Sequence, residues 1–576
     1  MKIPIYRNTT YLLISILVVA AIWRFLHIDQ PFIDSFSWRQ SSTAMMAENF
    51  YRKNWNIFYP EVSWDGPGPS YNGREFQTVT YITALLYTLL GQHDWVGRSV
   101  VVLFSLWGIF AFYQLVSRIW DRDRALMSAA ILAIFPGHIY VDRSFLPDPA
   151  MVALVVTSFW MLIAYLQTDR WYYLLLATLF ATWGFLTKLP GLIIGIPMLY
   201  TIFVVLGNRG LLRPKKLIVI GVAAISILLP VAAYYLWARH LALTYPPYHF
   251  AGSGNWLWDH GLQEWLQKKY FIPELYHLIS RRIWTYPIML LVAIGLFVPP
   301  HYKVPTQESE QQPSNVATRV PGMFHWWILA FAIYYFIGAQ QLVTNYSNLN
   351  IVNPAAAALA GNGVIAIASF AKRAGGSSSA LALITAILLI ISGIGYRQLN
   401  RWCYSPVAKD GYELGIALQQ ITQPSDLVVT IANRGGGDPV AIYYSRRRGW
   451  VFPPAIYWGS PPSSPQESMR KNSIYWKYPI TDDTLIAILE DLITQGADWM
   501  GIVKYGNKQI AKDNPKLVAY IQKTLELYQE TPNWVIYRIP PKIKTTKRSN
   551  QGTLGSSLSE VDYWNGMSEW VTGQSI

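Results

Sequence analysis

The chain has 576 residues, and its composition excludes an ordinary soluble protein. Hydrophobic residues make up 52% of the sequence and charged residues only 14%, and the mean hydropathy is +0.21. In so hydrophobic a chain the net charge of +14 favours topology signals and contacts with anionic headgroups over nucleic-acid binding. The single cysteine, Cys403, excludes an internal disulfide framework and a cysteine-rich metal site.

About eleven apolar segments are long enough to cross the roughly 30 Å of a bilayer's hydrocarbon core. The first follows Lys2 and Arg7 and has no small-residue cleavage site, so we expect a retained helix with the N-terminus inside. Basic residues between the later segments fall in alternate connections, as the positive-inside rule requires. The predicted segments are 9–28, 98–117, 125–141, 150–167, 171–187, 190–206, 217–237, 284–299, 323–341, 351–371 and 379–396.

This threading places the polar features of the chain on the outer face of the membrane. Within the long first loop, 29–97, residues 77–90 are apolar but short, so we expect a helix that lies at the interface. If that helix crossed the membrane, every later loop would change sides and the basic loops would lie outside. The other outer features are the loops 142–149 and 238–283, the turn 187–190, and everything after about residue 397.

The composition changes after residue 403. Short apolar runs predict strands, and apolar residues at helical spacing predict helices. The strands are expected at 426–431, 499–503 and 534–537, and the helices at 482–495 and 515–528. We therefore expect a helical membrane domain at 1–400, a small extracytoplasmic α/β domain at 401–541 and a disordered tail at 542–576.

Charged residues gather at the predicted outer ends of the helices. Asp34 and Arg39 follow the first helix, Arg143 and Asp148 stand just before the fourth, and Lys188 occupies an outer turn. Each has an ordinary explanation, such as a helix cap for Asp148 or snorkelling for Arg39. Their occurrence on one face favours a site, because an ionisable group at the membrane centre costs about 2.5 to 3.5 kcal/mol. Lys188 faces the side where a lipid phosphate would lie.

Glu75 stands at the start of the interfacial helix. It could orient a cation or a sugar hydroxyl, or it could be a favourable charge at a helix N-terminus. No two acidic residues have a compelling ligand spacing, so we predict no metal or other cofactor, although a divalent cation is possible.

Five segments carry an ordered set of motifs: Asp34 with Trp38-Arg39-Gln40, Arg74-Glu75-Phe76, the run 143–149, Thr187-Lys188, and Asn345-Tyr346 before Pro354. Together they resemble the dolichyl-phosphate-mannose protein mannosyltransferase-like glycosyltransferases. These enzymes have the GT-C fold and are akin to aminoarabinose transferases acting on lipid A. The resemblance covers about residues 10–400.

The resemblance implies a role for each motif residue. Asp34 would be the catalytic carboxylate and Asp148 the second acidic residue of the site. Lys188 and Arg39 would contact the carrier phosphate, and Tyr346 would bind substrate. Two departures affect the acceptor and phosphate contacts. Glu75-Phe76-Gln77 stands where some members have an acidic-basic-Pro-Pro sequence, so the basic phosphate ligand is either missing or replaced by Arg74. Asn345-Tyr346 stands where the family often has His and paired Tyr.

The chemistry explains how one carboxylate could suffice. A polyprenyl phosphate departs as a stable anion, so the reaction needs no general acid of the glycosidase kind. Asp34 would take the acceptor hydroxyl proton, while Lys188, Arg39 and Arg143 stabilise the departing phosphate. Asp148 would either position the acceptor or share the role of base. In-line attack would invert the anomeric centre.

The sequence therefore predicts a multi-pass plasma-membrane enzyme of the cell envelope. It would move a sugar from a polyprenyl-phosphate donor to a protein, lipid or glycan acceptor on the extracytoplasmic face. One alternative is a flippase or transporter of lipid-linked sugars, in which the charges line a path. Another is a non-catalytic scaffold whose α/β domain binds envelope partners. The one-sided polar loops and the absence of paired halves favour the enzyme.

Overall fold

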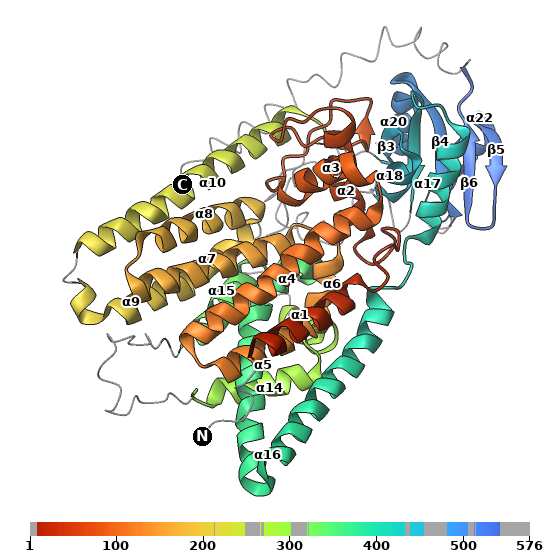
Figure 1. Cartoon of the computed structure of the whole chain (residues 1–576). Coiled ribbons are helices and arrows are strands. Elements are labelled where there is room, and N and C mark those ends of the chain that lie inside the picture. The colour runs from red at the N-terminus through yellow and green to blue at the C-terminus, as the bar shows by residue number, and fades with distance from the viewer. Residues whose placement is uncertain are drawn as a thin grey trace. The chain divides into compact units, whose positions relative to one another are not determined.

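The computed structural model describes residues 9–211, 214–247, 270–300, 322–432, 438–453, 481–504 and 514–541, together with Trp265, Val320 and Lys512 (Figure 1). It divides into two compact units. The first comprises the described residues up to Val62 and from Pro69 to Lys409. The second comprises Ser63–Gly68 and the described residues from Asp410 onward. The tail 542–576, predicted to be disordered, lies outside the described residues.

The first unit is built from helices. In chain order these are α1 (Thr9–Phe25), α2 (Ser37–Arg52), α3 (Thr78–Leu90), α4 (Asp94–Ile119), α5 (Arg122–Ala133), α6 (Pro136–Arg143), α7 (Asp148–Thr168), α8 (Trp171–Thr187), η2 (Leu189–Ile194), α9 (Gly195–Leu211), α10 (Pro214–Thr244), α13 (Phe271–Leu278), η3 (Ile279–Ile283), α14 (Tyr286–Phe297), α15 (Met323–Thr344), η5 (Tyr346–Val352) and α16 (Asn353–Trp402). The prediction of a mainly helical, polytopic membrane protein is confirmed.

Six helices of the described part are long and apolar enough to cross a membrane, or up to eight if each of two bent helix pairs is one span. The predicted span 125–141 is one such pair, because α5 and α6 meet at a bend of 62°. Pro136 begins α6, and proline lacks the backbone N–H that would continue α5. The predicted spans 351–371 and 379–396 both lie in α16. They are separated by a break at Gly376, whose φ of 80° suits glycine.

Burial separates the central helices from the peripheral ones. Helices α4, α7 and α8 pack side by side, and α10 packs on α8 (Figure 1). In α7, 94% of the most apolar stretch is buried, whereas only 11% of the corresponding stretch of α10 is buried. Helix α10 exposes a long apolar row that suits contact with lipid tails, and α7 forms the centre of the unit. The exposed row includes Ile218, Val222, Ile225, Leu229 and Leu236.

The predicted interfacial segment 77–90 forms helix α3. Its 13 residues span about 20 Å at 1.5 Å per residue, which is too short for a bilayer core. One face is buried, including Val79 and Tyr87, and the other exposes Leu85 and Leu89. The helix is therefore present as expected, and its position at the interface stays a prediction.

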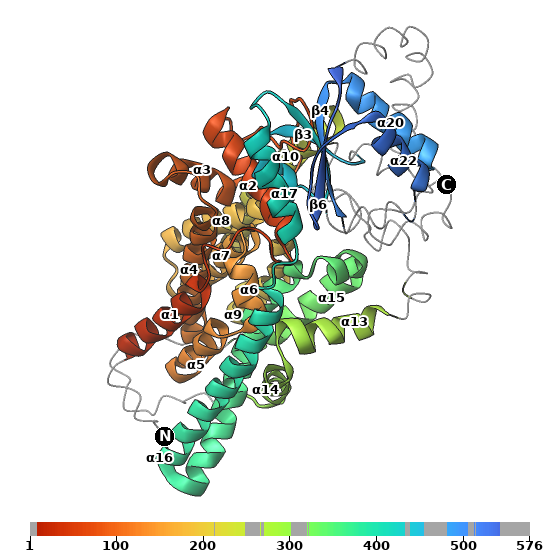
Figure 2. The same cartoon turned by 90° about the vertical axis from the view of Figure 1, so that its right-hand side faces the viewer.

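The second unit contains a six-stranded mixed sheet with helices on both faces (Figure 2). The sheet order is β1-β3-β2-β4-β6-β5. Strand β2 is parallel to β3 and β4, and the other neighbours are antiparallel. The elements are β1 (Asp65–Gly66), α17 (Lys409–Ile421), β2 (Leu427–Ile431), α18 (Val440–Ser445), β3 (Arg448–Val451), α20 (Asp482–Thr494), β4 (Ala497–Val503), α22 (Pro515–Thr524), β5 (Glu526–Glu530) and β6 (Trp534–Arg538).

Strand β4 shows how the two faces of this sheet are covered. Met500 and Ile502 pack in one core with residues of α20 and α22. Gly501 points to the opposite face, because side chains alternate along a strand, and there it lies against Leu414 and Leu418 of α17. The predicted strands and the helix at 482–495 are found. The helix expected at 515–528 ends at Thr524, since the residues after it form the exposed strand β5.

Candidate active site

A buried ion pair joins the start of α7 to the end of α8. These helices form an antiparallel hairpin, so the first residue of α7 lies beside the residue that follows α8. The Lys188 Nζ lies 2.7 and 2.8 Å from the two carboxylate oxygens of Asp148, and both side chains are buried. The carboxylate stands at a helix N-terminus and the ammonium at a helix C-terminus, where the helix dipoles favour each charge.

The loop before α3 adds a second ion pair. Arg39 Nη2 lies 3.0 Å from Glu75 Oε1. The start of α3 is held against the end of α8, because the hydroxyls of Thr78 and Thr187 lie 2.7 Å apart. Four of the predicted site residues are thus held at the ends of α2, α3, α7 and α8. We call them the lysine cluster: Arg39, Glu75, Asp148 and Lys188.

Surrounding cations fix the charge of Glu75. Burial alone would raise the pKa of Glu75, but the positive charges of Arg39, Lys188 and Arg74 outweigh burial and lower the pKa to about 2. Glu75 is therefore ionised at neutral pH. Lys188, which forms its ion pair with Asp148, also lies close enough to Glu75 to act on its charge.

This lowered pKa predicts a pH dependence of stability. A carboxyl whose pKa is lower in the folded protein stabilises the fold above its unfolded pKa, about 4.5, and loses that contribution as the pH falls towards about 2. We expect the unfolding temperatures of wild type and Glu75→Gln to differ by a constant amount from pH 7 to about 5. The difference should shrink at lower pH, and Arg39→Gln should move that loss to higher pH. A difference that does not change with pH would contradict the assignment.

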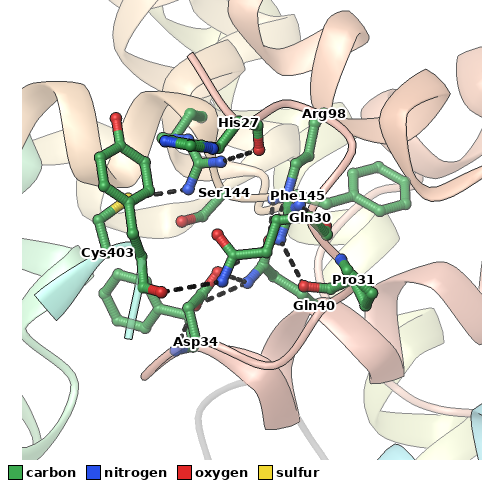
Figure 3. A network of polar contacts seen from close by, with 12 residues as sticks. His27, Gln30, Pro31, Asp34, Gln40, Arg98, Ser144, Phe145 and Cys403 are labelled. Atoms are coloured by element: carbon green, nitrogen blue, oxygen red, sulfur yellow. Dashed lines mark hydrogen bonds and ion pairs between the residues drawn. The ribbon is translucent and has the colours of Figure 1, made fainter. Parts of the chain in front are cut away.

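Asp34 lies fully buried just before α2, among several hydrogen-bond donors (Figure 3). Its Oδ1 accepts from the Phe36 backbone N at 2.8 Å, and Gln40 Nε2 lies 2.9 Å from both carboxylate oxygens. Arg98 of α4 forms an ion pair with Oδ2 at 3.3 Å, and the Tyr140 hydroxyl lies 3.4 Å from Oδ1. These contacts fix the position of the carboxylate. We call Asp34, Gln40, Arg98 and Tyr140 the aspartate cluster.

Two short segments connect the clusters. Arg39 and Gln40 are adjacent in the first turn of α2, and Arg39 contacts the lysine cluster while Gln40 contacts Asp34. Gln40 Oε1 also accepts a hydrogen bond from the Phe145 backbone N at 3.1 Å, just before Asp148 in the sequence. The first turn of α2 and the loop before α7 therefore hold both predicted catalytic carboxylates, Asp34 and Asp148, in one region of the first unit.

Arg143, predicted to stabilise the donor phosphate, has the contacts of a positioning residue. It is fully buried, its Nη1 lies 2.8 Å from Cys403 Sγ, and its Nη2 donates to the His27 carbonyl oxygen at 2.6 Å. Its guanidinium also lies 4.9 Å from the centre of the Tyr404 ring. These contacts hold the segment after α16 against the loop that leads to Asp34.

Tyr346 lies beside the aspartate cluster. Its ring centre is 4.9 Å from that of Phe36 and 6.3 Å from that of Tyr140. Tyr140, Tyr346 and Arg282 line a small groove together with residues of α6 and α16. Because Tyr140 both lines this groove and contacts Asp34, the groove approaches the buried carboxylate.

Two main partners of Asp34, Gln40 and Arg98, were not among the site residues predicted from the sequence. Gln40 belongs to one of the motifs, but no role was predicted for it. Arg98 was taken as the first residue of an apolar span. A buried arginine at the start of a span is costly without a partner, and that cost is the signal that could have marked Arg98. Arg74, considered as a replacement phosphate ligand, is buried, with its guanidinium 5.1 Å from the centre of the Trp38 ring.

No metal site emerges from the part of the chain that the structure describes. Within it, no group of three or more His, Cys, Asp or Glu side chains could hold a metal ion. That the reaction needs no metal remains a prediction.

A third polar network lies among the helices. Arg24 of α1 and Asp142 of α6 are fully buried and form an ion pair at 2.9 Å. Arg24 also donates to Ser105 Oγ at 2.7 Å, and Asp142 Oδ2 lies 3.2 Å from His138 Nε2. The network ties α1 and α4 to α6, which leads directly into the loop that ends at Asp148.

The chain has apolar helices suited to a membrane and charged residues gathered on loops of one region, and its likeness to solved structures shows that the fold is GT-C. The chain is similar to ArnT from Cupriavidus metallidurans bound to undecaprenyl phosphate (TM-score 0.58, 13% identity) and in the apo state (0.60, 12%), in each case over 92% of this chain and 98% of that chain. It is also similar to the archaeal oligosaccharyltransferase AglB from Archaeoglobus fulgidus, in complex with an inhibitory peptide and a dolichol-phosphate. There the TM-score is 0.54 and the identity 12%, over 94% of this chain and 77% of that chain. At such identities the likeness establishes the fold alone.

The sequence comparison adds a family match. Residues 78–234 match the family model described as dolichyl-phosphate-mannose-protein mannosyltransferase. This segment runs from α3 into α10 and contains Asp148 and Lys188. No curated protein matches the chain significantly. The resemblance seen in the motifs is confirmed: this is a multi-pass membrane protein with the GT-C glycosyltransferase fold.

Proposed function

We propose that the protein transfers a sugar from a polyprenyl-phosphate donor to an acceptor hydroxyl on the extracytoplasmic side of the plasma membrane, with its N-terminus in the cytoplasm. The observation that carries this proposal is the junction of the two clusters at α2. One cluster supplies cations for a phosphate, and the other supplies a carboxylate for the acceptor. The ligands in the similar structures, undecaprenyl phosphate in ArnT and a dolichol-phosphate in AglB, support a lipid phosphate as the carrier.

In this reaction the acceptor oxygen attacks the anomeric carbon and the bond from that carbon to the phosphate oxygen breaks. The hydroxyl proton passes to the Asp34 carboxylate, and the bonding electrons leave with the polyprenyl phosphate. Attack opposite the leaving group inverts the anomeric centre. Lys188 and Arg39 stabilise the charge that develops on the departing phosphate, in a buried site where such interactions are strong.

We infer that the acceptor reaches Asp34 past Tyr140. The Tyr140 hydroxyl makes the longest of the contacts described above, 3.4 Å to Asp34 Oδ1. A hydroxyl that enters by the groove between Tyr140 and Tyr346 replaces this contact first. Gln40 and the Phe36 backbone N meanwhile hold the carboxylate in place.

The test is transfer of a labelled sugar by the purified protein in lipid discs. A panel of polyprenyl-phosphate hexoses and pentoses is offered with envelope extract, and the anomeric configuration of the product is determined by NMR. Transfer with inversion supports the proposal. If the protein transfers no sugar but moves lipid-linked sugar across vesicle membranes, it is a flippase and the proposal is wrong.

A further inference from the structure

Lys188 uses two hydrogen bonds of about equal length on one partner, Asp148. An ammonium group has three N–H donors, and both oxygens of Asp148 lie within 2.8 Å of the Lys188 Nζ. This pairing leaves Lys188 little capacity for a second anion. A lysine held in this way cannot bind a phosphate fully without giving up its carboxylate.

We propose that Asp148 occupies the place of the donor phosphate on Lys188, and that the phosphate displaces it during each reaction cycle. This inference rests on the proposed function, because it assumes a lipid-phosphate donor. It gives Asp148 a role that differs from that of Asp34. Asp148 keeps the lysine charge neutralised between cycles and competes with the phosphate for it.

The contacts of the three carboxylates show why Asp148 is the one that exchanges. Asp34 is held by a backbone N–H and by side chains from α2 and α4. Glu75 pairs with Arg39 and not with Lys188, so a phosphate that binds Lys188 does not have to displace Glu75. Asp148 is bonded to the flexible end of a single lysine side chain, and a rotation about the lysine's side-chain bonds separates the two without moving a helix.

The charges around the lysine fit this exchange. Arg39, Arg74 and Lys188 are cations and Glu75 and Asp148 are anions, so these five residues carry one net positive charge. A polyprenyl-phosphate sugar is a phosphodiester with one negative charge, which matches that surplus. The free phosphate formed by the reaction gains a second charge, with a pKa near 6. A return of Asp148 to Lys188 then promotes release of the product.

The exchange predicts that Asp148→Asn strengthens phosphate binding. The probe is undecaprenyl phosphate, titrated into the full-length protein in lipid discs, with undecaprenol as the neutral control. We expect Asp148→Asn to bind the phosphate about tenfold more tightly than wild type, because a competing charge within hydrogen-bond reach is removed. Binding of undecaprenol should not change. Lys188→Gln, alone or combined with Asp148→Asn, should bind the phosphate more weakly than wild type.

Glu75→Gln is the matched control. It removes one negative charge from the same five residues but leaves the hydrogen-bond partner of Lys188 in place. A larger gain for Asp148→Asn than for Glu75→Gln supports the exchange. Equal gains, or no gain for a folded Asp148→Asn protein, overturn it and leave the proposed function intact. If wild type and every variant fail to bind undecaprenyl phosphate, the proposed donor class is wrong and the exchange falls with it. Asp148→Ser, which also removes the charge and keeps a polar side chain, serves in place of Asp148→Asn if the asparagine variant does not fold.

Discussion

Lys188→Met is expected to lower the rate of sugar transfer by about 10²- to 10³-fold, the loss seen when one group that stabilises a developing oxyanion is removed. The methionine is similar in length but carries neither charge nor N–H donors. The departing phosphate then loses its buried ammonium partner. The measurement is the initial rate of transfer with donor in excess.

This variant needs a check on folding, because it leaves Asp148 buried without its lysine. Removing one partner of a buried ion pair costs about 3 to 5 kcal/mol. The double variant Lys188→Gln with Asp148→Asn removes both charges together, so it should be more stable than Lys188→Met and equally impaired in transfer. Lys216→Met is the control. Lys216 pairs with Asp169, at the opposite end of α7 from Asp148. If the double variant transfers sugar at the wild-type rate, Lys188 is not a phosphate ligand.

Arg24→Met is expected to destabilise the protein by about 3 to 5 kcal/mol, because it leaves the fully buried Asp142 carboxylate without its cation. The contacts from Ser105 and His138 remain, but neither supplies the permanent charge of a guanidinium. The measurement is the unfolding midpoint of the purified protein in one fixed detergent.

The matched control is again Lys216→Met. The carboxylate that this variant leaves behind, Asp169, is 63% exposed, so water can solvate it and the expected loss is about 0 to 1 kcal/mol. If the two variants lost equal stability, Arg24→Met would not leave a buried carboxylate without its cation, and the prediction would be wrong. Because α6 leads into the loop before Asp148, Arg24→Met should also lower sugar transfer in the molecules that remain folded.

The pairing of Asp148 with Lys188 is the part of the site that sequence analysis could predict best. Helices α7 and α8 have similar lengths and a short turn between them, so an antiparallel hairpin brings the start of one to the end of the other. The positive-inside pattern placed both residues on one face. The hairpin alone brings Asp148 and Lys188 together, so the pairing depends on no contact with a distant part of the chain.

The surroundings of Asp34 depend on contacts that sequence spacing does not encode. Arg98 reaches Asp34 from another helix, and Arg143 reaches Cys403 across 260 positions of the chain. A charged residue next to an apolar run predicts that a partner exists, because burial without one is costly. It does not say which residue that partner is, since the answer depends on how the helices pack.

The membrane helices and the sheet show the same contrast. Apolar runs predicted most helices to within a few residues, but the bend before Pro136 and the long helix α16, interrupted at Gly376, follow from local backbone geometry within those runs. In the second unit, the two-residue strand Asp65–Gly66 comes from the first predicted loop and pairs with Arg448–Val451. A strand of two residues carries no alternation pattern, so its partner could not be predicted.

The most direct test of the account is release of free polyprenyl phosphate by the purified protein in lipid discs, with acceptor-containing envelope extract, compared between wild type and Asp34→Asn. Wild type should release free polyprenyl phosphate from at least one donor of the panel. That release should be lost in an Asp34→Asn protein that still unfolds in one cooperative transition. Release at the wild-type rate by the folded variant would contradict the role of Asp34, and the absence of release from every donor would contradict sugar transfer itself.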